Sequence, residues 1–228
     1  MANEDYSQPV FNTLPLAVIA LAVFILAIEL IFMAGARGYF GPEGIGWRVA
    51  AIQDYGFFNQ ALYFMVERGE FRFDLAIRFV TYPFVHAAFT HAIFVIVFLL
   101  ALGKLVGEVF GNLAVLVLFF ACGTFGALVY AGLTGADQLL IGGFPSVYGL
   151  IGAYTFLLWV QYGALGQNQY QAFTLIGFLL GIQLIFGVLF GTNNDWIAEI
   201  AGFVFGFFLT PALVPGAFQR FLERMRQR

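Results

Sequence analysis

Charged residues are scarce in this 228-residue sequence: they make up 10% of the chain, whereas soluble domains contain about 25%. The chain therefore lacks the polar surface that a protein needs to face water on all sides. Its net charge of −3 argues against nucleic acid as a partner. With a single cysteine, Cys122, it can form no internal disulfide and no cysteine-based metal site, and we expect Cys122 to be a small core residue.

Long apolar segments make up most of the sequence. Hydrophobic residues make up 61% of the chain, and six segments approach the length of about 20 apolar residues that a membrane-spanning helix needs. The sequence therefore predicts an all-α integral membrane protein with six transmembrane helices. The expected spans are Leu14–Gly35, Thr81–Gly103, Leu113–Leu133, Phe144–Tyr162, Phe173–Phe190 and Trp196–Val214.

The connections between the spans are of two kinds. Residues 36–80 form a long link in which aromatic and charged residues alternate, a mixture that favours short helices lying in the membrane interface. The later links are short, which makes sequence neighbours antiparallel and adjacent. They are Lys104–Asn112, Thr134–Gly143 and Gly163–Ala172.

The two ends of the chain are polar. Residues 1–13 form an acidic tail without the basic region of a signal peptide, and residues 215–228 form a tail that contains several arginines. Arginines close to a span favour the cytoplasmic side, although the long link is also basic. We expect both termini in the cytoplasm, and a multi-pass protein of the bacterial inner membrane.

Pairs of small residues mark the faces where the predicted helices should touch. Lipid supplies little hydrophobic force between helices, so close backbone approach at glycine contributes much of their packing energy. The candidate packing residues are Gly149 and Gly152, Gly177 and Gly181, and Gly202 and Gly206.

Four ionisable residues lie within the predicted apolar spans, where such groups are costly and usually paired or functional. Glu29 is near the outer end of the first span, where a structural role is expected. His86 and His91 would lie about 140° apart around one helix, so they should line a cavity rather than bind a metal ion together. Glu199 is one turn inside the last span, where we expect a buried side chain with a hydrogen-bonding partner.

Several motifs resemble those of the rhomboid intramembrane serine proteases. Residues 78–91, Arg-Phe-Val-Thr-Tyr-Pro-Phe-Val-His-Ala-Ala-Phe-Thr-His, resemble the start of that family's second helix, and residues 107–111, Gly-Glu-Val-Phe-Gly, resemble the turn after it. Residues 142–152 and 198–206 are similar to the glycine-rich start of its fourth helix and to its sixth helix. The resemblance implies a six-helix rhomboid-like bundle with a long interfacial loop after the first helix.

The resemblance does not extend to the catalytic positions. The family uses a serine at the start of the fourth helix as nucleophile, a histidine in the sixth as general base, and an asparagine in the second to hold the oxyanion. These positions are Phe144, Glu199 and Val95 in this chain. Because a serine hydroxyl is a poor nucleophile without an adjacent base, the resemblance implies a pseudoprotease with no catalytic residues.

Two alternatives remain. Ser146 is a fallback nucleophile for an active rhomboid endopeptidase, with Glu199 or His91 as an unconventional base; we expect it instead to be a helix-start serine bonded to the backbone. A transporter or proton path would use Glu29, His86, His91 and Glu199, but charged groups are few for a continuous path.

The favoured function is the binding of transmembrane segments of partner proteins, as an adaptor, a chaperone or an accessory subunit of a larger membrane complex. Phe144 and Val95 should fill the former catalytic space. Glu199 is expected to hydrogen-bond His86, His91 or Tyr148. We expect no cofactor, no metal ion and no nucleic acid, only partner helices and the lipid bilayer. The residues expected to line the cavity are His86, His91, Tyr148 and Glu199.

Overall fold

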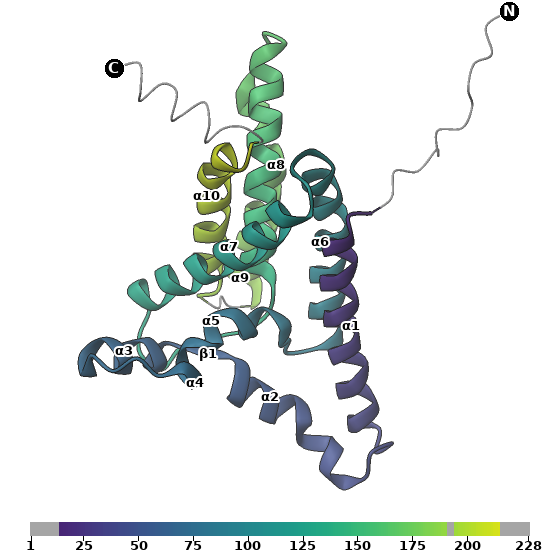
Figure 1. The fold of residues 1–228 in the computed structure, drawn as a ribbon, viewed down its shortest axis with the longest axis vertical. Coiled ribbons are helices and arrows are strands. Elements are labelled where there is room, and N and C mark those ends of the chain that lie inside the picture. Colours follow the sequence, from purple (N-terminus) through teal and green to yellow (C-terminus); the bar gives the residue numbers. More distant parts are fainter. Residues whose placement is uncertain (1–13, 191–193, 215–228) are drawn as a thin grey trace, which may run out of the picture.

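A computed structural model describes residues 14–190 and 194–214, and most of these are helical (Figure 1). The long helices α1 and α6 lie side by side, and α7, α8 and α10 pack together next to them. The predicted tails, 1–13 and 215–228, lie outside the described residues. The long helices are α1 (Leu16–Ala36), α6 (Phe89–Phe110), α7 (Asn112–Leu133), α8 (Phe144–Ala164), α9 (Thr174–Phe190) and α10 (Trp196–Leu213).

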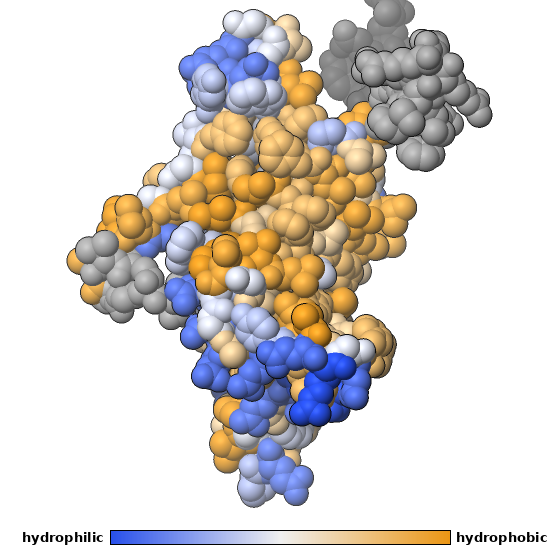
Figure 2. Space-filling model, turned by 90° about the vertical axis from the view of Figure 1, so that its left-hand side faces the viewer, coloured by the Kyte–Doolittle hydropathy of each residue, from blue (hydrophilic) through white to orange (hydrophobic). Residues whose placement is uncertain are grey.

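Four of the described helices, α1, α6, α7 and α10, are long and apolar enough to cross a membrane. Helix α8 has the length, with 21 residues, but it carries the polar side chains of Ser146, Thr155 and Gln161. Helix α9 is apolar and has 17 residues. Figure 2 shows an apolar band across the middle of one face, with more polar surface above and below it. The chain is a multi-pass membrane protein.

The second predicted span begins too early. Helix α6 starts at Phe89 rather than at Thr81, because Pro83 lies in a short 3-10 turn after which the chain becomes extended and proline cannot continue a hydrogen-bonded helix. His86 therefore precedes the helix. The angle predicted between His86 and His91 on a common helix does not apply.

The same helix also ends later than predicted. Helix α6 continues through Lys104, which was assigned to a link, as far as Phe110. Gly111 then adopts a φ of 83°, which favours glycine, and α7 begins at the next residue. One glycine thus makes the whole turn between these two helices.

The segment between α1 and α6 contains the short helices that its composition predicts, and their position at the membrane interface stays a prediction. It also contains a strand that the sequence did not indicate: β1 pairs antiparallel with a strand of the α7–α8 loop, with Phe57 opposite Leu140. The short elements are η1 (Pro42–Gly46), α2 (Trp47–Tyr55), β1 (Phe57–Phe58), α3 (Asn59–Arg68), α4 (Phe73–Ala76), α5 (Arg78–Thr81), η2 (Tyr82–Phe84), β2 (Leu139–Leu140) and η3 (Gln169–Phe173).

Arg78 and Thr81, the two named residues of the Arg-x-x-Thr motif, form hydrogen bonds with the backbone at the end of α2. Arg78 Nη1 donates hydrogen bonds to the carbonyl oxygens of Gln53 and Gly56, at 2.7 and 2.9 Å. The Thr81 hydroxyl donates to the Tyr55 carbonyl at 3.0 Å. These bonds satisfy backbone carbonyls that the end of a helix leaves without partners, and they join α2 to the chain that leads into α6.

Glycines allow the backbones of α8 and α10 to approach closely. A Cβ atom added at Gly202 or Gly206 would overlap a backbone carbonyl of α8, and one added at Gly152 would overlap a carbonyl of α10. Gly149 instead lies against Cys122 of α7, which is buried. These four predicted packing residues therefore lie where α7, α8 and α10 meet.

The packing face predicted at Gly177 and Gly181 is wrong. A Cβ atom added at either residue would meet no atom of the described residues within 4 Å. Helix α9 makes its most extensive contact with η3, the segment that precedes it, and its side chains Phe178, Leu184 and Leu189 are exposed. The two glycines follow the helical spacing of a contact face, but α9 lies at the edge of the bundle.

We predict that Gly206→Ala destabilises the protein by about 1–3 kcal/mol or more, because the new methyl group overlaps the Gly149 carbonyl oxygen and overpacking carries a cost of that order. Gly177→Ala is the matched control: it adds the same methyl group in open space and should be neutral or stabilising. Thermal unfolding in detergent can be followed with a thiol-reactive dye, since the single cysteine is buried. Equal melting temperatures for the two variants would contradict the packing assigned to Gly206.

Candidate functional site

The loop before α8 is held against the segment that precedes α6. Gly142 has a φ of 90°, and its N–H donates to the Tyr82 carbonyl at 3.0 Å. The next N–H, of Gly143, donates to His86 Nε2 at 3.4 Å. A Cβ atom on Gly142 would lie 2.5 Å from the His91 ring. Glycine is therefore required here by backbone conformation and by the closeness of the imidazole.

Apolar groups fill the space around this loop. Phe144 begins α8 and stacks on His91, with ring centroids 5.1 Å apart and an interplanar angle of 17°. His91 meets the edge of His86 at 5.0 Å. Val95 lies one turn further along α6, is fully buried and faces Gly143. The structure thus brings together Phe144, Val95 and both histidines.

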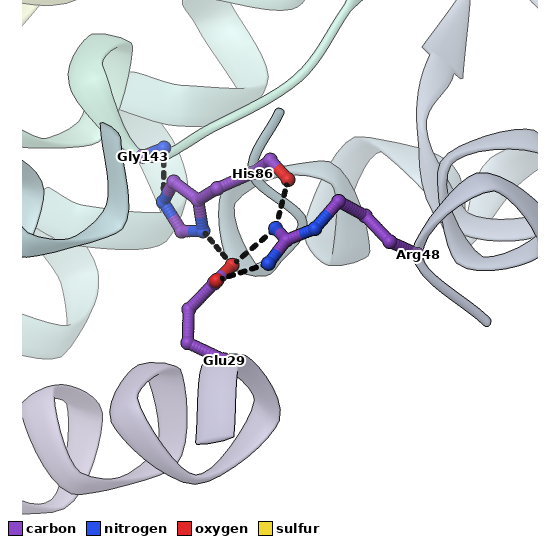
Figure 3. A network of polar contacts seen from close by, with 4 residues as sticks. All are labelled: Glu29, Arg48, His86 and Gly143. Carbon is purple, nitrogen blue, oxygen red and sulfur yellow. Dashed lines mark hydrogen bonds and ion pairs between the residues drawn. The ribbon is translucent and has the colours of Figure 1, made fainter. Parts of the chain in front are cut away.

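A buried ion pair lies on the other side of His86 (Figure 3). Glu29 of α1 is fully buried and receives two hydrogen bonds from Arg48 of α2, at 3.0 and 2.7 Å. Arg48 also donates to the backbone carbonyl of His86 at 2.7 Å. Two parallel N–H···O bonds of this kind are among the strongest polar contacts in proteins. The pair joins α1, α2 and the segment before α6.

The hydrogen bond from Gly143 suits one form of the His86 ring. His86 Nε2 accepts this bond at 3.4 Å, which fits a neutral ring with its proton on Nδ1. Nδ1 points toward Glu29 Oε1, 3.8 Å away, which is too far for a hydrogen bond. The imidazole therefore lies between the buried carboxylate and the loop before α8, with Nε2 engaged on the loop side.

The sequence identified Glu29 as structural but did not identify its partner. Arg48 lies in the aromatic link among several other arginines, so composition gave no reason to select it. The available signal was the carboxylate itself, because a buried charge at membrane depth needs a counter-charge. The fold, rather than the spacing, determines which arginine supplies it.

Ser146 faces away from the histidines. Its side chain is fully buried, and its hydroxyl has no hydrogen-bond partner among the described residues. A Cβ atom added at Gly123 of α7 would overlap that hydroxyl. Two residues on a helix correspond to about 200° of rotation from Phe144, which directs Ser146 toward α7. The backbone hydrogen bond predicted for Ser146 is therefore absent in the described part of the chain.

Glu199 has a partner that the sequence did not suggest. It is 5% exposed and accepts a hydrogen bond from Gln183 Nε2 of α9. The prediction that it bonds His86, His91 or Tyr148 is wrong for the described residues. The sequence predicts α9 only as an apolar span, and Gln183 is a polar residue near its middle. Glu199 faces that helix and bonds this residue.

A cavity of about 150 Å³ lies beside this pair. Tyr148 and Gln183 are the polar residues in its wall, and His86, His91 and Glu199 do not line it. The other lining residues are Phe98 of α6, Phe144, Val147 and Ile151 of α8, and Leu179 and Ile182 of α9.

The two polar groups of the site are separate. Hydrogen bonds and ion pairs join Glu29, Arg48, His86 and Gly143, and another bond joins Gln183 to Glu199. Within residues 14–190 and 194–214, none links the two groups, which argues against a continuous proton path. No set of three or more His, Cys, Asp or Glu side chains in those ranges is placed to hold a metal ion.

Comparison with known proteins identifies one family. The family model described as Rhomboid domain matches residues 74–216, more than half of the chain. The match contains His86, His91, Phe144, Ser146 and Glu199, and it excludes Glu29 and Arg48. No curated protein matches the chain.

We predict that removing either member of the Glu29–Arg48 pair is strongly destabilising. Arg48→Met leaves a buried carboxylate without a cation, which costs about 3–5 kcal/mol. The double variant Glu29→Leu/Arg48→Met should lose less than the sum of the two single variants. Melting temperatures of the four proteins form the double-mutant cycle.

Arg72→Met is the matched control. Arg72 pairs with Asp74 at 2.6 Å, but their side chains are 51% and 60% exposed, so solvent screens the pair. The melting temperature should not change. Additive losses at Glu29 and Arg48 would show that their pairing contributes nothing to stability.

We predict that Glu199→Leu lowers stability by about 1–3 kcal/mol, the cost of leaving a buried polar partner without its hydrogen bond. The partner is the Gln183 amide, so Gln183→Leu/Glu199→Leu should recover part of the loss. The same thiol-dye melting experiment measures both. A rise in melting temperature for Glu199→Leu alone would contradict a stabilising hydrogen bond.

Proposed function

The chain belongs to the rhomboid family, and on this premise we propose that it is a pseudoprotease, which binds transmembrane segments of partner proteins without cleaving them. The observation that best supports the proposal is the stacking of Phe144 on His91. It places an apolar ring where the family resemblance puts the nucleophile.

Each part of the family's chemistry has an inert counterpart in this chain. Phe144 has no hydroxyl to attack a carbonyl carbon. Glu199, at the position of the general base, is bonded to Gln183. Val95 offers no donor to an oxyanion, whose stabilisation is usually the largest single contribution to such catalysis. Losing all three together removes the nucleophile, its activation and the charge stabilisation.

An active peptidase that uses Ser146 is the alternative. A serine nucleophile needs a base within hydrogen-bonding reach and access for substrate and water. Ser146 is fully buried, and its hydroxyl has no partner in the described part of the chain. Its contact is the backbone of Gly123 on α7, on the far side of α8 from Phe144. The geometry favours a packing role.

We further propose six spans, with α8 and α9 added to the four apolar helices. Helix α8 has 21 residues and packs between α7 and α10, which buries Ser146 and Thr155 away from lipid, while Gln161 is exposed near the end of the helix. Helix α9 is apolar except for Thr174 and Gln183. The elements α2 to α5 would lie at the outer interface, and both termini in the cytoplasm of a bacterium, since arginine-rich tails are hard to translocate.

Helix α9 favours a binding role. It contacts mainly the segment before it, and it exposes Phe178, Leu184 and Leu189. An apolar helix at the edge of a rigid bundle offers a surface on which another membrane helix can pack. The protein would serve as an adaptor, a chaperone or an accessory subunit of a membrane complex, with no cofactor.

We predict that a fluorophosphonate probe, which reacts with activated serine nucleophiles, does not label the purified protein. The reason is that the hydroxyl of Ser146 is buried and has no hydrogen-bonded base within residues 14–190 and 194–214. The measurement is intact-protein mass spectrometry after incubation in detergent and in liposomes. An active rhomboid protease is the positive control.

The decisive comparison is with Ser146→Ala. Covalent labelling of the native chain that disappears in Ser146→Ala would establish a serine enzyme and overturn the pseudoprotease. Labelling that persists in the variant would be reaction at another residue and would leave Ser146 inert.

A further inference from the structure

The pair of Gln183 and Glu199 has more acceptors than donors. Gln183 Nε2 donates to one carboxylate oxygen of Glu199. The remaining carbonyl oxygen of Gln183 is buried and has no hydrogen-bond partner among the described residues. An ionised carboxylate only accepts hydrogen bonds. When Glu199 is ionised, the pair therefore lacks a donor for the Gln183 carbonyl oxygen, and a cation that stabilises the ionised form is what an external donor can supply.

No cation compensates this carboxylate within the described ranges. The ion pairs there involve Glu29, Asp74 and Glu108, and none involves Glu199, which is 5% exposed. Glu29 provides the contrast inside the same protein, because its buried carboxylate has Arg48. A carboxylate at membrane depth without a cation is costly, and a partner that brings one would be attracted to it.

The neighbouring cavity is the right size for one side chain. Its volume is about 150 Å³, whereas sites for small molecules usually span about 300–1,000 Å³. Gln183 and Tyr148 supply its polar wall, and the rest is apolar. Such a lining suits a long side chain with an apolar stem and a polar end.

Two of the helices around the cavity, α6 and α9, make little contact with each other. Its wall runs from Phe98 of α6 across α8 to Ile182 of α9, and Ile182 is 37% exposed. Helices α6 and α9 have no extensive contact with each other. An opening between two membrane helices is reached from the bilayer, so the occupant that fits is a side chain carried by another transmembrane helix.

We infer that the site between α6, α8 and α9 recognises a partner transmembrane helix that carries a lysine or arginine at membrane depth. The aliphatic stem of that residue fills the cavity, and its charged end lies against Gln183 in the cavity wall, where it is attracted to the Glu199 carboxylate bonded to the Gln183 amide. This inference rests on the proposed function, to which it adds the chemistry of the partner.

The test uses two synthetic helices of about 22 residues, long enough to span a bilayer, built from leucine and alanine. One has a single lysine at its centre and the other has leucine there. Each carries a fluorophore, and binding to the full-length protein in liposomes is measured by energy transfer from a labelled terminus. The lysine helix should bind at least about tenfold more tightly, which corresponds to about 1.4 kcal/mol.

Glu199→Gln is the informative variant, since it removes the charge and keeps the size of the side chain. It should reduce the preference for lysine to less than about threefold while the leucine helix binds as before. Glu108→Gln is the matched control, because Glu108 pairs with Lys104 near the other end of α6. That variant should keep the full preference. The thiol-dye melting temperature confirms that both variants are folded.

The outcomes separate the inference from the proposed function. Equal binding of the two helices, or a lysine preference that survives Glu199→Gln, would overturn the inference and leave helix binding intact. If neither helix binds the native protein, the proposed function and the inference are both wrong.

Discussion

The arrangement of the site depends on one buried ion pair. Glu29 is a carboxylate in the second half of the apolar helix α1, and Arg48 approaches it from the segment that follows. The third hydrogen bond of Arg48, to the His86 carbonyl, fixes the chain just before α6. His86 in turn accepts a bond from the loop that starts α8. Two helices and two loops thus share one centre, in which separation of α1 from α2 would leave the buried Glu29 carboxylate without its cation.

The residues that the family resemblance aligns with the catalytic positions are packed beside that centre. A phenylalanine at the start of α8 is accommodated because its ring stacks on His91, which the family resemblance does not place in the nucleophile–base pair. Val95 fills the space under Gly143. The substituted residues therefore contribute packing, while the glycines that bring α8 and α10 together are kept.

The sequence predicted the features that depend on local pattern. Apolar runs gave the long helices, and the motifs around His86, Gly142 and Glu199 gave the family, which the match over residues 74–216 confirms. What it missed depends on contacts between distant segments. Arg48 was one arginine among several, and Gln183 was a single polar residue in an apolar helix. The pairing of β1 with β2 joins two stretches of two residues each, too short to leave a periodic signal.

The incorrect predictions of a helix boundary and of a packing face also have physical causes. Residues 81–88 are apolar enough to be assigned to a membrane span, but Pro83 prevents the α-helix from forming there. Glycines at positions 177 and 181 look like a contact face, but spacing alone does not say that a neighbour is present.

The contrast between these glycines and those of α10 is the most informative one for function. Helices α7, α8 and α10 are joined by backbone contacts that allow no added atom, whereas Gly177 and Gly181 of α9 have open space beside them among the described residues, and the hydrogen bond between Gln183 and Glu199 connects α9 to α10. Because the close backbone contacts of the core do not involve α9, a change in the position of α9 need not disturb them.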